Sequence, residues 1–231
     1  MATPSSIPYP VVPIKEEDAD LFKSVVKYVH EYMSQPGHDN SHDFLHILRV
    51  VSNANRILEA ELKANPAQKY DTSALFLAAL LHDVGDRKYA KPGEDVEQQI
   101  SRVLVELGAP EHLALKVQAI AKHVSYSVET KKPEAVKEVL LEHPELAIVQ
   151  DSDRLDAIGA IGVGRAFSYG AAKCPDKPMS RAVDHFTEKL FKLEGMMKTT
   201  TGRELAQARH KILEDFAVQF RQESELTITL Q

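Results

Sequence analysis

Histidine and aspartate side chains occur in short segments whose spacing favours a shared metal site. His42 and His46 are four residues apart in a predicted helix, so they share one face of that helix. His82 and Asp83 close a predicted helix that is otherwise apolar. Such a helix excludes imidazole and carboxylate groups unless they find partners, and a divalent cation can bind both groups at once. The sequence therefore predicts a divalent metal ion near these side chains.

A further polar segment, residues 150–156, contains Asp151, Asp153 and Asp156. Carboxylates packed this closely repel one another unless a cation or an arginine neutralises them. We expect this segment to face such a positive charge. His123, at the end of another predicted helix, is an additional candidate.

The composition is that of an ordinary folded domain. Of 231 residues, 43% are hydrophobic and 27% are charged, which excludes a disordered or low-complexity chain. The net charge is −6 and no long run of Lys or Arg occurs, which disfavours a nucleic-acid scaffold. A nucleotide substrate is still compatible with this charge, because a bound metal supplies positive charge locally.

Cysteine content and apolar runs indicate the compartment. The single cysteine, Cys174, cannot form an internal disulfide, which favours a reducing compartment. Residues 1–20 have neither the basic start nor the apolar core of a targeting peptide. The longest apolar run, residues 74–81, is far shorter than the roughly 20 residues that a membrane helix needs. We expect a cytoplasmic monomer or homodimer that binds no membrane.

The elements that must position the polar residues are predicted to be helices. Apolar residues recur at three- and four-residue spacing, and strand signals are nearly absent. Asp71 or Thr72 caps a helix that is apolar on every side and must therefore be buried. We predict an all-α, single-domain bundle over residues 18–223, with an extended proline-rich arm (1–17) and a C-terminal tail (224–231). The predicted helices cover residues 21–32, 41–64, 74–81, 96–107, 112–123, 144–167, 181–197 and 203–223.

Three motifs carry a resemblance to a known family. His46-x-x-Arg49-Val50, Leu81-His82-Asp83 and Asp153-Arg154-Leu155-Asp156-Ala157 resemble the H…HD…D signature of the HD-domain metal-dependent phosphohydrolases. Residues 150–167 and His185-Phe186-x-x-Lys189-Leu190 are similar to a branch of small stand-alone members. Some of that branch hydrolyse nucleoside triphosphates to the monophosphate and pyrophosphate. The resemblance therefore implies a helical HD domain with that activity.

The resemblance also implies the metal ligands, which fall on His46, His82, Asp83 and Asp153. Asp151 is the alternative to Asp153, which we prefer because the family's ligand aspartate usually stands two residues before a leucine, here Leu155. Mixed imidazole and carboxylate donors suit one divalent ion, Mn²⁺ or Mg²⁺ first and Fe²⁺ or Co²⁺ as alternatives, rather than a structural zinc.

Catalytic and substrate-binding candidates follow from charge near the motifs. Asp86 is the carboxylate expected to orient or deprotonate a water, with Asp151 behind it, and Lys88 is expected to act on the phosphate charge. The side chains expected to bind an anionic phosphorylated substrate, most simply a nucleotide, are Arg49, Arg87, Lys88, His123, Arg154 and Arg165. Arg49 and Arg154 are equally compatible with structural ion pairs.

Other functions fit the same motifs. The alternatives are a nucleotidase or phosphomonoesterase of the same fold, a di-iron oxygenase, and a metal-binding regulatory module. The oxygenases typically carry an extra histidine just before the HD doublet, where this chain has Leu81, although His123 could serve as an additional ligand. The glycines at 159, 162 and 164 are expected to let helices approach closely rather than to cradle a phosphate, because no strand precedes them.

Overall fold

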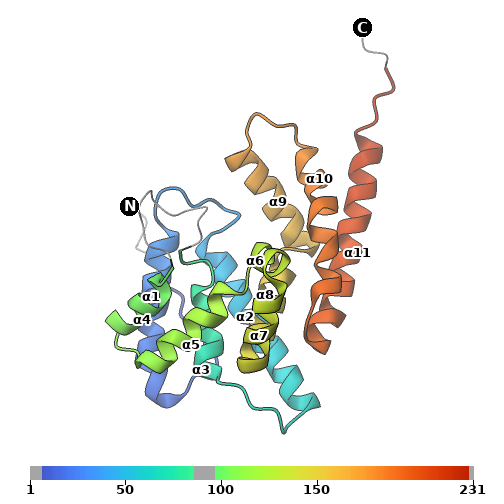
Figure 1. The fold of residues 1–231 in the computed structure, drawn as a ribbon. Coiled ribbons are helices and arrows are strands. Elements are labelled where there is room, and N and C mark those ends of the chain that lie inside the picture. Colours follow the sequence, from blue (N-terminus) through green and yellow to red (C-terminus); the bar gives the residue numbers. More distant parts are fainter. Residues whose placement is uncertain (1–6, 86–96, 229–231) are drawn as a thin grey trace.

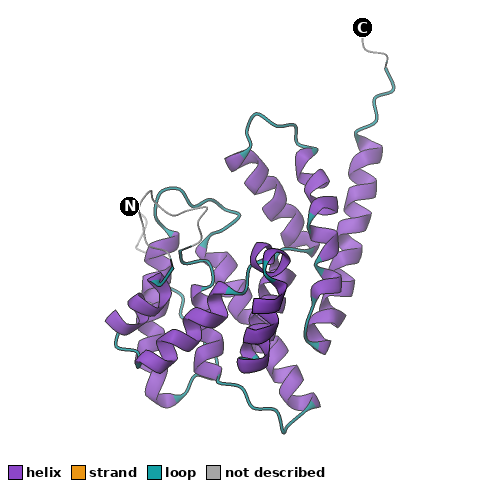
Figure 2. Ribbon diagram, viewed as in Figure 1, coloured by secondary structure: helices purple, strands orange, loops and turns teal. Residues whose placement is uncertain are grey.

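The computed structural model describes residues 7–85 and 97–228, which form an all-α domain with no β-strand in these ranges (Figures 1 and 2). The all-α prediction is confirmed. None of the helices in these ranges combines the length and the apolar composition that a membrane-spanning helix needs. The helices are α1 (Ala19–Met33), α2 (Phe44–Ala64), α3 (Thr72–Leu81), α4 (Gln99–Glu106), α5 (Glu111–Lys122), α6 (Tyr126–Lys131), α7 (Pro133–Glu142), α8 (Glu145–Asp156), α9 (Gly159–Lys173), α10 (Arg181–Glu188) and α11 (Thr200–Glu223).

The apolar helix α3 lies at the centre of the fold, as its composition predicts. Asp71 caps it by accepting a hydrogen bond from the Ala74 N–H, and residues 73–81 are all buried. Helices α1, α2, α5 and α8 pack around it. Because α3 is enclosed on every side, its last residues deliver His82 and Asp83 to the interior of the domain.

Helix α2 begins two to three residues later than predicted. The Asp43 side chain accepts a hydrogen bond from the His46 N–H at 2.9 Å, so Asp43 is the N-cap and Phe44 the first helical residue. His42 therefore lies outside the helix, and the prediction that His42 and His46 share a helical face is wrong. His46 sits in the first turn, which is fixed by this cap.

The predicted helix over residues 144–167 is broken into α8 and α9. Gly159 has φ +72°, a left-handed conformation that most residues avoid, and the chain changes direction there. The close approach predicted for the glycines occurs at Gly162, where an added Cβ would lie 2.2 Å from the Ala157 carbonyl oxygen. Composition alone concealed this break, because residues on both sides favour helices.

The other differences concern short helices. Helices α6 and α7 were not predicted, and the predicted helix over residues 181–197 ends at Glu188 and continues as two 3₁₀ turns, Leu190–Lys192 and Glu194–Met196. Helices α9, α10 and α11 pack together on one side of the domain (Figure 1), where the rings of Phe167, Phe186, Phe216 and Phe220 contact one another.

Gly162→Ala should destabilise the domain, because the new methyl group would collide with backbone at the α8–α9 junction. We expect the free energy of unfolding to fall by about 1–3 kcal/mol, the usual cost of overpacking. Gly164→Ala is the matched control in the same helix, since an added Cβ there meets nothing within 4 Å. It should leave stability unchanged or raise it by roughly 0.5–1 kcal/mol through helix propensity. Urea denaturation of both variants measures the difference, and equal stabilities would contradict the close approach.

Candidate metal centre

Four side chains from three separate segments converge in the interior. His46 comes from the first turn of α2, His82 and Asp83 directly follow α3, and Asp153 lies on α8. The His46 Nε2 atom lies 3.2 Å from His82 Nε2, 3.2 Å from Asp83 Oδ2 and 3.6 Å from Asp153 Oδ1. His82 Nε2 lies 3.6 Å from Asp83 Oδ1 and 3.7 Å from Asp153 Oδ1. His46, His82 and Asp83 each offer one ligand atom within 4.8 Å of the others, and Asp153 adjoins both histidines. We call these four residues the candidate cluster.

The hydrogen bonds of the two imidazoles decide which nitrogens face the cluster as acceptors. His46 Nδ1 donates to Asp156 Oδ2 at 2.7 Å, and His82 Nδ1 donates to the Ala79 carbonyl at 2.9 Å. A carboxylate and a carbonyl only accept, so in each neutral ring the proton is on Nδ1 and the lone pair is on Nε2. Two such lone pairs facing each other repel unless a cation lies between them. This arrangement fits a metal ion.

The carboxylates of the cluster fit a metal as well. The Asp83 side chain is mostly buried, and its Oδ2 atom has no hydrogen-bond donor among the residues that the structure describes. Burial alone would raise the pKa of Asp83, but the positive charge that His82 and His46 carry when protonated outweighs burial and holds that pKa well below its ordinary value, and a divalent ion between neutral imidazoles would supply charge of the same sign. Two imidazole nitrogens and two carboxylates form a donor set suited to Mn²⁺, Mg²⁺ or Fe²⁺.

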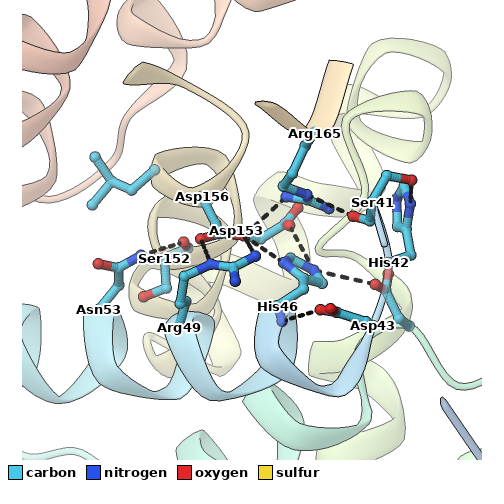
Figure 3. Close-up of polar contacts among 12 residues, drawn as sticks. Ser41, His42, Asp43, His46, Arg49, Asn53, Ser152, Asp153, Asp156 and Arg165 are labelled. Atoms are coloured by element: carbon cyan, nitrogen blue, oxygen red, sulfur yellow. Dashed lines mark hydrogen bonds and ion pairs between the residues drawn. The ribbon is translucent and has the colours of Figure 1, made fainter. Parts of the chain in front are cut away.

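Asp156 is the functional residue that the sequence reasoning missed, although it was counted among the clustered carboxylates. It is buried and accepts hydrogen bonds from three side chains on two helices: from His46 Nδ1 and from Arg49 Nε at 2.7 Å and Nη2 at 3.0 Å, both on α2, and from Arg165 Nη1 at 3.1 Å on α9 (Figure 3). Against the effect of burial, these donors hold the pKa of Asp156 far below its ordinary value. The sequence contains one signal that could have identified Asp156. It stands three residues after Asp153, a spacing that places both side chains on one face of α8.

Asp156 thereby orients a candidate ligand. A metal-ligating histidine usually donates its other ring N–H to a carboxylate, which fixes the ring and its tautomer. Arg49 and Arg165 in turn fix Asp156, and Arg165 Nε also donates to the Ser41 carbonyl at 2.6 Å. The structure thus places both arginines, predicted to bind substrate, on this carboxylate.

Asp151 and Arg154 do not join the cluster. Asp151 is fully buried and accepts hydrogen bonds from the Lys198 and Thr199 N–H groups and the Thr199 hydroxyl, ahead of α11. Two residues correspond to about 200° around a helix, so Asp151 and Asp153 lie on nearly opposite faces of α8. Arg154 is 2% exposed and donates to Glu129 and to the Met196 carbonyl. These contacts favour the structural interpretation of both residues over catalysis by Asp151 or substrate binding by Arg154.

The remaining predicted residues lie beside or beyond this geometry. His123 follows α5 and donates from Nδ1 to the Ala119 carbonyl at 2.7 Å, while its own carbonyl accepts a hydrogen bond from Gln150 on α8. Gln150 is three residues before Asp153, so His123 adjoins the same helix as the cluster. Asp86, Arg87 and Lys88 lie outside the described residues, shortly after Asp83 in the chain.

Comparisons with known proteins find a matching family model, a similar sequence and similar folds. The family model described as HD domain matches residues 43–158, a range that includes the whole candidate cluster. The Bacillus subtilis protein YpgQ is 36% identical over 191 residues, which cover 80% of this chain and 85% of YpgQ. The crystal structure of YpgQ in complex with ADP aligns with a TM-score of 0.65 and 30% identity, covering 87% of this chain and 97% of YpgQ. An HD-superfamily hydrolase from Bacillus thuringiensis aligns with a TM-score of 0.63 and 30% identity, covering 90% and 97% of the respective chains.

Proposed function

The chain belongs to the HD domain family, and on this premise we propose that it is a metal-dependent phosphohydrolase that cleaves nucleoside triphosphates to the monophosphate and pyrophosphate. The observation that carries the proposal is the convergence of two imidazole Nε2 atoms with Asp83 and Asp153. Similarity to an HD-superfamily hydrolase along nearly the whole chain supports hydrolysis as the reaction class.

His46, His82, Asp83 and Asp153 would hold one divalent ion, for which we propose Mn²⁺ or Mg²⁺. When bound, such an ion polarises a phosphoryl oxygen and lowers the pKa of water toward neutrality. The protein's own contribution is orientation. Asp156 keeps the His46 proton on Nδ1, and Arg49 and Arg165 keep Asp156 charged and in place. In this proposal the two arginines position the site instead of touching the substrate.

The groups that would act on the substrate follow the cluster in sequence. We assign to Asp86 the orientation of the attacking water and the acceptance of its proton. To Arg87 and Lys88 we assign the neutralisation of the negative charge of the phosphates. His123 has its Nδ1 bonded to a carbonyl, so its Nε2 is the nitrogen available for a phosphate oxygen or a water. Three phosphate-binding groups, Arg87, Lys88 and His123, suit a polyphosphate better than a monophosphate.

The nucleotide class is supported by a relative. YpgQ, to which this chain is 36% identical, has been crystallised in complex with ADP. ADP carries a diphosphate, and a site that accepts it has room and charge for more than one phosphoryl group. On the basis of this similarity we propose a nucleotide as the substrate of this chain.

Product analysis tests the reaction. Protein stripped of metal and reloaded with Mn²⁺, Mg²⁺, Fe²⁺ or Co²⁺ is incubated with nucleoside triphosphates and monophosphates, and products are separated by chromatography. We expect monophosphate and pyrophosphate from the triphosphate, and no turnover by the stripped protein. Nucleoside and orthophosphate from the monophosphate, with the triphosphate untouched, would identify a nucleotidase instead. Oxygen consumption by the iron-loaded protein, without hydrolysis, would identify an oxygenase.

A further inference from the structure

A cleft lies beside the candidate cluster, between α2, α9 and α11. Its volume is about 370 Å³, and its lining includes three arginines, Arg49, Arg56 and Arg209. We call it the arginine cleft. Asp156, at the end of α8, is the only carboxylate that lines it in the part of the chain that the structure describes. The proposed reaction does not use this cavity.

The positive charge in the cleft exceeds the negative charge. Arg49 is paired with Asp156, whose carboxylate also accepts from Arg165 on another side. Arg209 donates only to uncharged acceptors, the Leu155 carbonyl and Asn53 Oδ1. Arg56 is exposed and has no hydrogen-bond or ion-pair partner within residues 7–85 and 97–228. The guanidinium groups of Arg56 and Arg209 therefore line one cleft, and neither is paired with a carboxylate among the described residues.

The two groups also affect each other. Burial lowers the pKa of Arg209, and the like charge of Arg56 lowers it further, against the opposing effect of Asp156. An anion between the two guanidinium groups would relieve this repulsion. Ala160 and Ile161, in the first turn of the fifteen-residue helix α9, line the same cleft, and no side chain caps that helix. Its free N–H groups add to the positive potential.

We propose that the arginine cleft binds a small anion bearing two or more phosphate groups, held by Arg56 and Arg209. Guanidinium forks match phosphate oxygens in geometry as well as charge. A single phosphate would fill little of a cavity of about 370 Å³, and Ile161 and Ile212 offer an apolar wall beside the arginines. Inorganic pyrophosphate and the polyphosphate of a nucleotide share the required chemistry.

The cleft is joined to the candidate cluster through two residues. Arg49 lines the cleft and binds Asp156, and Asp156 binds His46. An occupant of the cleft would therefore lie beside Asp156, the group that orients a candidate metal ligand. The binding itself does not depend on the proposed reaction, since it requires no metal and none of the candidate cluster.

Isothermal titration calorimetry of inorganic pyrophosphate into the full chain tests the site. A chelator keeps the protein metal-free, so that pyrophosphate cannot bind through a metal ion at the candidate cluster. We expect saturable binding of one pyrophosphate per chain. Arg56→Glu should weaken it by about tenfold or more, the effect of losing one charged hydrogen bond. Arg221→Glu, at an exposed arginine near the end of α11 outside the cleft, is the matched control for charge and should bind within about twofold of wild type.

A second variant approaches the cleft without removing an arginine. Ser52 is exposed and lines the cleft, so Ser52→Asp places a carboxylate beside the guanidinium groups and should also weaken binding about tenfold.

Equal losses in Arg56→Glu and Arg221→Glu, or no saturable binding by wild type, would overturn the inference. Parallel titrations with ADP and with pyrophosphate distinguish a nucleotide site from a site for the bare diphosphate. If pyrophosphate binding depends on Arg56 while the metal-reloaded protein hydrolyses none of the nucleotides, the proposed reaction is refuted and this site is left intact.

Discussion

Asp83→Ala should lose both the bound metal and the hydrolytic activity. Asp83 supplies a buried carboxylate oxygen that has no hydrogen-bond donor within the described ranges and that faces His46 Nε2 at 3.2 Å. Without it, the two imidazole nitrogens have one carboxylate, Asp153, to complete the donor set. We expect the rate of triphosphate hydrolysis to fall on the order of 10³-fold or more, the scale of removing a principal electrostatic group. Elemental analysis and a product assay measure the two losses on the same sample.

A control separates this effect from the loss of any histidine or carboxylate. His143 follows α7 and contacts only Glu142 among the described ion pairs, so His143→Ala should keep metal and activity. Asp83→Asn preserves the side-chain shape but removes its charge, and should resemble Asp83→Ala in metal content. Full metal occupancy in either Asp83 variant would sink the ligand assignment.

Asp156→Ala should damage both the fold and the metal affinity. It would leave the Arg49 and Arg165 guanidinium groups without their shared carboxylate and His46 Nδ1 without its acceptor. Removing one partner of a buried ion pair typically costs about 3–5 kcal/mol of stability. Loss of the carboxylate behind a ligating histidine typically costs about 10–100-fold in metal affinity. Denaturation of the metal-free protein and metal titration measure these effects separately.

The pH dependence of stability gives an independent check on Asp156. Its pKa is far below the ordinary value in the folded state, so its charge stabilises the fold at neutral pH, and this contribution is lost as the pH falls through the acidic range. In the metal-free protein, the stability difference between wild type and Asp156→Asn should therefore shrink below about pH 4. Asp184→Ala, at an exposed carboxylate on α10, should show no such difference at neutral pH. A constant difference between wild type and Asp156→Asn down to pH 2 would contradict the role of the charged carboxylate.

Local rules in the sequence were sufficient for the helices that carry the site. Helix α3 is apolar all round and has an aspartate cap, so its burial and its polar end at His82 and Asp83 follow from composition. The four members of the candidate cluster were named from residue type and family resemblance, and the structure brings them within 3.2–3.7 Å of their neighbours. A metal site of this kind can be predicted from the sequence because imidazoles and carboxylates are rarely buried together without a partner that neutralises or binds them.

The roles of neighbouring polar residues depended on the tertiary structure. Asp151, Asp153 and Asp156 lie within six residues, yet their partners differ: the turn of α8 directs Asp151 toward the segment before α11, while Asp153 and Asp156 share the other face and meet the cluster and the arginines, respectively. The partners of Asp156 come from positions 107 residues before it and 9 residues after it, which no local pattern relates. The surroundings of the break at Gly159 are likewise distant in sequence, since a Cβ added at this glycine would lie 3.1 Å from the Arg209 side chain of α11. Residue types thus specified which groups could do chemistry, while long-range packing selected which of them meet.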